Sequence, residues 1–505
     1  MSNVGFKSPI AKPVTLHALP SNNKCSRGKV VWVHASVVAS VALTLYADDP
    51  VMTLVAGGAL ISPLFVWLAI LEARRTSLIL GPLSFYFLWY AVGLGLSSFY
   101  AAYLLLRDGF ISFSVADISP HDIAVGYVVF LVGSVAFHAG MQSLRPRFDE
   151  ESALPQKPSG TIKTLLAMGA IGIAILIRPG WFQALGTITH PLQMAPLTGL
   201  VIFGLLGRKY FKLRRDVFAL IFGMGTAVLF VLNLRSGSKA FLMYSFLPLT
   251  WMILLRRDLR RWLPVLLPGL AALYLMVIAP SVTRARVTSL AQGETPVSHL
   301  VHSFSAGDQT DTPVGAFMSD QVGGFLMRQF DVLPVSFLVR EVGKNGYQMG
   351  ETMRYASYAF IPRLLWPDKP ALTRGAWFYA YVGGSPRESE ATSSLGITAA
   401  GELYWNFGIG GVLVGMFAIG CGYAILWRLA GSNPLTQPLH MLLYVLISIY
   451  GMVDMPEAVT VFAAICSELL VFGTLFLVFD RRKQTRQIRM RVIERPFPAA
   501  RTVGS

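Results

Sequence analysis

The chain has 505 residues, of which 54% are hydrophobic and only 14% are charged, and its mean hydropathy is +0.54. These values exclude a soluble globular domain and a disordered chain, and they indicate a polytopic membrane protein. The net charge of +16 does not indicate a nucleic-acid partner, because the cations are spread over short loops. Three scattered cysteines, Cys25, Cys421 and Cys466, cannot form a disulfide framework.

Residues 1–29 are basic and contain no apolar core, so we predict a cytoplasmic tail and not a cleaved signal peptide. A spanning helix needs about 20 apolar residues. Twelve segments are candidates, in chain order 30–47, 51–71, 78–106, 123–144, 162–178, 192–207, 217–234, 240–255, 262–280, 399–427, 437–453 and 457–479. The sequence therefore predicts an all-α fold of about twelve transmembrane helices, nine within 30–280 and three within 399–479. A basic cytoplasmic tail is expected over 480–505.

The loop charges predict the orientation of these helices. With the N-terminus inside, 29 of the 43 Lys and Arg residues fall in cytoplasmic segments and only four in short outer loops. The other ten lie in one polar stretch, 281–398, which is too long for the charge rule to apply. Both termini are therefore predicted to be cytoplasmic, and 281–398 is predicted to be one large extracytoplasmic loop.

Within this loop, residues 322–342 mix apolar and charged side chains at helical spacing. The pattern predicts an amphipathic helix that lies on the membrane surface and is bent by Pro334. Residues 347–360 are expected to form a second short helix.

Seven cations are expected on the outer side, close to the bilayer. Each alone is better explained as a contact with lipid headgroups. Three separate segments supply them, however, and the guanidinium fork matches phosphate oxygens two at a time. We therefore expect a binding site for a lipid-linked phosphate or pyrophosphate formed by Arg235, Lys239, Arg284, Arg286, Arg363, Lys369 and Arg374.

Glu402 is the candidate catalytic residue. It follows Thr398 by four residues, one turn into an apolar helix whose N-terminus is expected to face outward. It could act as a general base or hold a sugar hydroxyl. The alternative is a carboxylate that merely stabilises the first turn of the helix. Tyr404 is expected either to belong to an interfacial aromatic belt or to contact sugar rings.

Metal binding is not expected. His299, His302, Asp308 and Asp311 form H-x2-H and D-x2-D pairs, but their spacing fits no strong zinc pattern. Either aspartate remains an alternative to Glu402 as the base.

The order of parts resembles the bacterial O-antigen and capsule repeat-unit polymerases of the Wzy type. Such proteins have about a dozen spans and one dominant late outer loop. They often have a Gly-Ser-Arg turn, here Arg235-Ser-Gly-Ser-Lys239 with lysine in place of arginine. The most specific match is Pro-Arg-x2-Trp-Pro-x-Lys-Pro at Pro362–Pro370, followed by Thr-x2-Gly-Glu-x-Tyr-x-Asn-Phe-Gly at Thr398–Gly408.

The resemblance implies a fold related to the C-type membrane glycosyltransferases and glycosyl transfer without metal or cofactor. The substrate would be an undecaprenyl-pyrophosphate-linked oligosaccharide on the outer face of the bacterial inner membrane. Implied partners are membrane lipid, a chain-length regulator and other polysaccharide assembly proteins.

Two alternatives to a polymerase stay open. A ligase that moves the finished glycan to another acceptor needs the same arginines and outer loop. A lipid-linked oligosaccharide flippase or other transporter should show an internal repeat and ionisable residues in its span centres. No repeat is visible, and ionisable residues are sparse in the predicted spans.

Overall fold

The computed structural model describes the following parts of the chain: residues 25–45, 48–76, 81–108, 118–144, 162–178, 189–204, 208, 211–234, 245–250, 322–327, 329–359, 361, 366, 375–382, 386–388, 395–431, 438–450 and 457–493. These residues form helices and the turns between them, with no strand among them, as the predicted all-α class requires.

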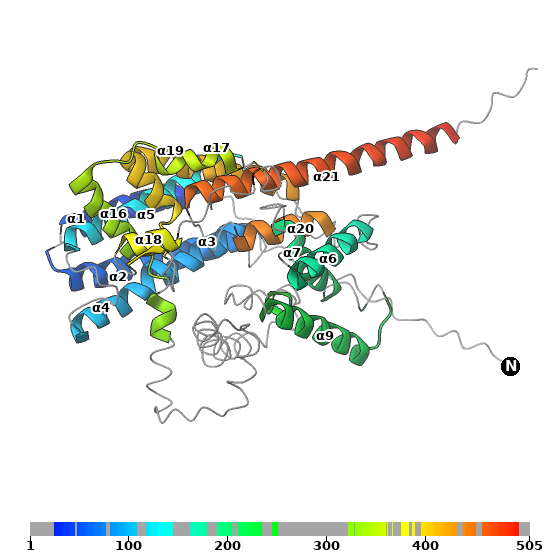
Figure 1. Cartoon of the computed structure of the whole chain (residues 1–505), viewed down its shortest axis with the longest axis horizontal. Coiled ribbons are helices and arrows are strands. Elements are labelled where there is room, and N and C mark those ends of the chain that lie inside the picture. Colours follow the sequence, from blue (N-terminus) through cyan, green and yellow to red (C-terminus); the bar gives the residue numbers. More distant parts are fainter. Residues whose placement is uncertain are drawn as a thin grey trace, which may run out of the picture.

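The first half of the chain supplies the helices that Figure 1 colours from blue to green. They are α1 (Cys25–Leu45), α2 (Pro50–Thr76), α3 (Pro82–Tyr90), the π-helix η1 (Ala91–Leu96), α4 (Ser97–Asp108), α5 (Pro120–Ser143), α6 (Ile162–Ile177), α7 (Thr189–Ile202) and α9 (Arg215–Leu234). The second half supplies α16 (Val332–Asn345), η6 (Thr352–Tyr355), α17 (Ala356–Ala359), α18 (Gly375–Tyr381), α19 (Ala399–Ala430), α20 (Pro438–Tyr450) and α21 (Ala458–Ile493).

Among the described residues, six helical stretches are long and apolar enough to cross a membrane, which is consistent with a multi-pass membrane protein. They are Pro50–Ala73, Pro82–Asp108, Pro120–Ser143, Arg215–Asn233, Ala399–Ala430 and Ala458–Val478. Shorter apolar helices coincide with four more predicted spans, 30–47, 162–178, 192–207 and 437–453. Of the predicted span 240–255 only residues 245–250 are described, and the predicted span 262–280 lies outside the described residues. The count of twelve therefore stays a prediction.

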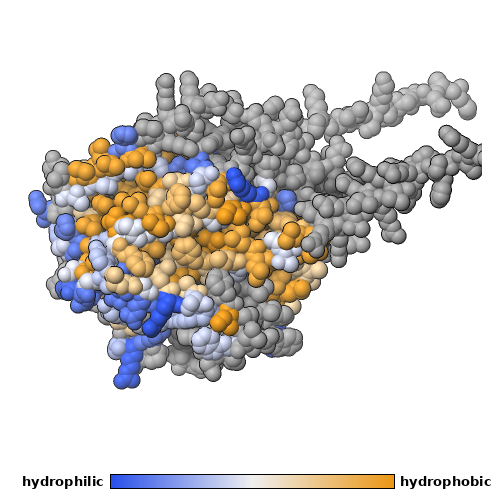
Figure 2. Space-filling view, turned by 90° about the horizontal axis from the view of Figure 1, so that it is seen from above, coloured by the Kyte–Doolittle hydropathy of each residue, from blue (hydrophilic) through white to orange (hydrophobic). Residues whose placement is uncertain are grey.

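Helix α5 lies at the centre of the bundle and packs against α19, α16, α1 and α2. Small residues allow the closest approach: the Cβ position of Gly140 faces the carbonyl of Phe417, and that of Gly420 faces the carbonyl of Phe137. Such contacts are typical of membrane helices, which associate by close backbone packing. Apolar side chains cover the middle of the face that Figure 2 shows, as expected for a lipid-facing belt.

The polar segment between α9 and α19 contributes a helix to the bundle interior. The sequence predicts one bent surface helix over 322–342, and this prediction is wrong. The helix over 322–327 ends, and α16 begins at Val332, with Pro334 in its first turn where proline is tolerated. Every residue from Val332 to Val339 is buried, and α16 packs on α5 and α19. It is therefore part of the core and does not lie on the membrane surface.

Helix α21 is longer than predicted. Its apolar part, Ala458–Val478, matches the predicted span 457–479, but the helix continues to Ile493. The basic stretch after Asp480 is therefore helical for about half of its length, as Figure 1 shows for the end of α21.

Candidate functional site

Helix α19 is broken at Gly408, within the motif Thr398–Gly408. The backbone of Gly408 has φ 65° and ψ −159°, a conformation that only glycine adopts readily. The residues on its two sides are helical, so the segment consists of a short helix over 399–407 and a longer helix over 409–430. We call these α19a and α19b. The 22 residues of α19b suffice to span a membrane without α19a.

The contacts show that α19a folds back along α19b. The side chain of Leu403 touches the Cβ position of Gly415, and the carbonyl oxygen of Leu403 lies 2.8 Å from the Cβ position of Gly411. In a straight helix, Leu403 and Gly415 would be about 18 Å apart. Ala400 and Val412 both contact Gly133, near the middle of α5. The N-terminus of α19a therefore points toward the middle of the bundle. Which side of the membrane it faces stays a prediction.

Glu402 lies on this reversed helix and is only 1% exposed. Its Oε2 accepts a hydrogen bond of 3.2 Å from the backbone N–H of Val459, the second residue of α21. The first backbone N–H groups of a helix have no partner within it, and the helix dipole favours an anion there. Glu402 therefore caps α21 from another helix. A buried carboxylate needs such a partner, because removing it from water costs several kcal/mol.

Asn406 lies within the motif Thr398–Gly408 and links residues 350–352 to the turn at Gly408. It is fully buried, and its Nδ2 donates to Thr352 Oγ1 at 2.6 Å and to the carbonyl of Glu402 at 2.8 Å. Its Oδ1 accepts from the backbone N–H of Gly350 at 3.0 Å. The last carbonyls of α19a, those of Trp405 and Asn406, accept from the N–H groups of Gln348 and Met349. Residues 348–352 therefore complete the hydrogen bonds that the break leaves open.

A second carboxyl group, which the sequence analysis missed, lies at the start of α21. Glu457 is 3% exposed and precedes the first residue of the helix, and its Oε2 accepts from Thr460 Oγ1 at 3.3 Å. Glu402 and Glu457 thus both lie at the first turn of α21. The sequence carries a signal for this position, because Pro456-Glu457 directly before an apolar run is typical of a helix N-terminus.

Of the nine predicted site residues, the structure describes Glu402 and Tyr404. Tyr404 is 8% exposed and packs edge-on against Tyr347, with ring centroids 6.3 Å apart, close to the turn at Gly408. The other seven lie outside the described residues: Arg235, Lys239, Arg284, Arg286, Arg363, Lys369 and Arg374.

Residues of metal-ligating type do not gather in the described part of the chain: no group of three or more His, Cys, Asp or Glu is found there. The pairs His299/His302 and Asp308/Asp311 lie outside the described residues.

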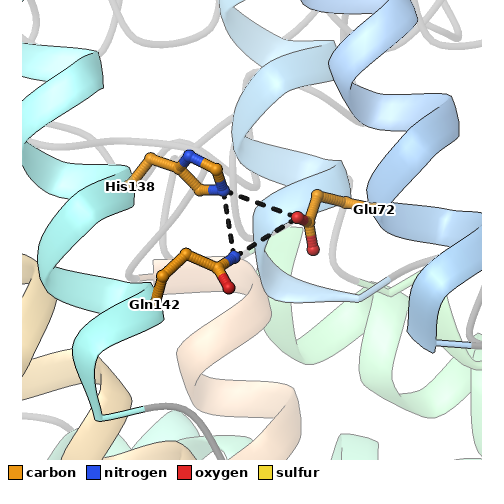
Figure 3. A network of polar contacts seen from close by, with 3 residues as sticks. All are labelled: Glu72, His138 and Gln142. Atoms are coloured by element: carbon orange, nitrogen blue, oxygen red, sulfur yellow. Dashed lines mark hydrogen bonds and ion pairs between the residues drawn. The ribbon is translucent and has the colours of Figure 1, made fainter. Parts of the chain in front are cut away.

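A separate polar cluster joins the C-terminal ends of α2 and α5 (Figure 3). Glu72 Oε1 lies 3.4 Å from His138 Nε2 and accepts from Gln142 Nε2 at 3.3 Å. Glu72 and His138 are about 5% exposed, and Trp32 of α1 packs edge-on over the imidazole. Because α2 and α5 run in parallel and Glu402 lies near the middle of α5, this cluster is separate from the Glu402 site.

The arrangement defines what the site can do chemically. A carboxylate with a fixed orientation lies in a bundle interior, beside a helix N-terminus and next to the polar segment that precedes α19. Such a group can accept a proton from a hydroxyl or orient that hydroxyl by a hydrogen bond. Comparison with protein-family models, curated proteins and solved structures finds no match to this chain.

Proposed function

We propose that the protein is a membrane glycosyltransferase that polymerises undecaprenyl-pyrophosphate-linked oligosaccharide repeat units. It would act on the outer face of the bacterial inner membrane, with Glu402 as the base for the acceptor hydroxyl. The leaving group is a lipid pyrophosphate, whose developing charge requires fixed cations. The arginines and lysines of the outer segments, Arg284, Arg286 and Arg363 among them, are proposed to supply these cations.

One observation carries this proposal: the buried carboxylate of Glu402 on the short helix α19a, which folds back along α19b. Ionisable groups inside a membrane bundle are expensive and therefore mark functional sites. This one lies directly after the long polar segment, on a helix of only nine residues, which is too short to cross a membrane. This position supports the proposed role of Glu402 as the base.

The glycan ladder of a deletion strain tests the proposal. A polymerase mutant should lose the ladder but keep a single repeat unit attached to its final acceptor. Complete loss of attached glycan would instead indicate a ligase or a transporter. Restoration of the ladder by the wild-type chain, but not by Glu402→Gln at equal expression, would support the assigned role of Glu402.

A second candidate is transport of the lipid-linked oligosaccharide, and the broken α19 favours it. Many transporters bind their substrates where interrupted helices leave half-helix N-termini inside the membrane. The start of α21 beside Glu402 has this character. Reconstitution in vesicles distinguishes the two functions, because a polymerase lengthens lipid-linked units without needing to move them across the bilayer.

A further inference from the structure

Aromatic rings gather on α18 beside the reversed helix α19a. Trp377 and Tyr381 are stacked, with centroids 5.2 Å apart and an interplanar angle of 21°. Trp377 also stacks on Trp405 of α19a, at 6.1 Å and 27°. We call Trp377, Tyr381 and Trp405 the aromatic platform. Phe378 and Phe337 pack into the same apolar cluster, which holds α18 against α16 and α19a.

The platform is buried on one side and open on the other. Trp405 is only 3% exposed, Trp377 is half-buried, and Tyr381 is 43% exposed. Large aromatic surfaces that stay exposed while their neighbours are buried are typical of binding sites. The buried apolar cluster holds the platform rings in place, so little side-chain conformational entropy is lost when a ligand stacks on these rings.

Polar groups border the exposed ring. The hydroxyl of Tyr381 donates to Glu341 Oε2 at 3.1 Å, and Asn345 Nδ2 donates to the same oxygen at 3.0 Å. Arg340 lies 3.8 Å from Glu341 Oε1. Burial of the hydroxyl and the nearby negative charge of Glu341 both raise the pKa of Tyr381, so it remains a donor at neutral pH. Acceptors and donors in fixed positions therefore lie beside an apolar ring.

We propose that the aromatic platform binds a sugar ring of the glycan substrate, beside the short helix α19a that also carries Glu402. A pyranose has an apolar C–H face, which suits stacking on Trp377 and Tyr381, and hydroxyl groups, which suit Glu341 and Arg340. A lipid tail offers no hydroxyl, and a lipid phosphate would be repelled by Glu341. The site is therefore assigned to an uncharged or amino sugar. This assignment rests on the proposed function, because it names the substrate class of the same site.

Trp405 links the platform to the catalytic candidate. It lies three residues after Glu402 on α19a, so both side chains are fixed by the same short helix. A sugar on the platform would thus be positioned by the element that carries the proposed base. The platform residues are substrate-binding groups and take no part in proton transfer.

Binding of free oligosaccharide to the purified full chain tests this assignment without requiring turnover. The probe is the oligosaccharide released by mild acid from lipid-linked repeat units, titrated by calorimetry into protein in lipid nanodiscs. Trp377→Ala and Tyr381→Ala should each raise Kd about threefold to tenfold, the range expected for the loss of one aromatic contact. Tyr381→Phe keeps the ring and should have a smaller effect. Glu402→Gln should bind normally while losing polymerisation.

Trp67 provides the matched control, because it is also a partly exposed tryptophan, but it lies on α2, whereas the platform residues lie on α18 and α19a. Trp67→Ala should leave Kd unchanged. Equal weakening by Trp67→Ala, unchanged binding in Trp377→Ala and Tyr381→Ala, or absence of binding to the wild-type chain would each overturn the assignment. If the wild-type chain polymerises repeat units but the platform variants bind sugar normally, the sugar site is wrong and the proposed function stands. If the wild-type chain binds sugar at the platform but never polymerises repeat units, the proposed function is wrong and the sugar site stands.

Discussion

Two properties of Glu402, its basicity and its hydrogen bond to Val459, can be separated by substitution. The side-chain carbonyl of glutamine can still accept from the N–H of Val459, but the amide is not a base. Alanine removes both the acceptor and the base. The pair of variants therefore distinguishes a proton acceptor from a residue that only caps α21.

We expect Glu402→Gln to lower the rate of polymerisation about 10²–10⁴-fold, the usual contribution of general acid–base catalysis. Its thermal stability should stay close to that of the wild type. Glu402→Ala should lose activity and also about 1–3 kcal/mol of stability, because a buried N–H is left without an acceptor. The measurements are turnover of purified lipid-linked units and thermal unfolding in detergent. Near-normal turnover of Glu402→Gln would remove it as the base and direct attention to Glu457, Asp308 and Asp311.

The predicted cations give a second test at the scale of single residues. Arg284→Ala, Arg286→Ala and Arg363→Ala should each strongly reduce activity while the protein level in the membrane is unchanged. Lysine at these positions should also be poor, because a point charge does not reproduce the guanidinium fork. Full activity of all three alanine variants would contradict a pyrophosphate site. The glycan ladder, compared at equal expression, is the measurement.

At the scale of elements, the turn at Gly408 determines where the site lies. An L-residue at φ 65° and ψ −159° is strained by about 1–3 kcal/mol. A Cβ atom would also lie 2.9 Å from the hydroxyl of Tyr347. Gly408→Ala should therefore lower the midpoint of thermal unfolding and reduce activity.

Gly410→Ala is its matched control. This glycine is helical, nothing lies within 4 Å of its Cβ position, and alanine is the better helix former. It should be neutral or stabilising. If Gly408→Ala unfolds at the same temperature as Gly410→Ala, the turn in α19 is not a constrained feature of the fold.

The sequence predicts the existence of these elements better than their direction. Hydropathy depends only on the residues in a stretch of chain, so it identifies 399–427 as one apolar segment. It cannot detect that the backbone reverses direction within that segment. The reversal depends on the left-handed φ of Gly408 and on hydrogen bonds from Gln348 and Met349, which are distant in sequence. For the same reason α16 was predicted on the surface: its mixed composition resembles an interfacial helix until α5 and α19 cover it. Glu402 could be selected from its motif, but its partner Val459 could not.

At the scale of the whole molecule, several carboxyl groups are buried although ionisable residues are sparse in the predicted spans. Glu72, Glu402, Glu457 and Glu468 are each at most 5% exposed, although the apolar helices around them contain few charges. Sparse ionisable residues therefore do not mean an interior without them. Since Glu72 pairs with His138 near one end of the bundle and Glu402 lies near its middle, the two sites can be altered independently.

The distribution of Lys and Arg residues predicts how the whole chain is oriented in the membrane. Because only four Lys and Arg residues fall in the predicted short outer loops against 29 in the predicted inner segments, residues 281–398 should lie outside the cytoplasm. Single cysteines at Ser298 or Ser385, in a chain whose Cys25, Cys421 and Cys466 are replaced, should react with an impermeant thiol reagent added from outside. A cysteine at Ser432, in a predicted inner loop, should react only after the membrane is opened. The reverse pattern would place Glu402 and the aromatic platform toward the cytoplasm. A polymerase of the outer leaflet would then be excluded, since its lipid-linked substrate would not reach the site.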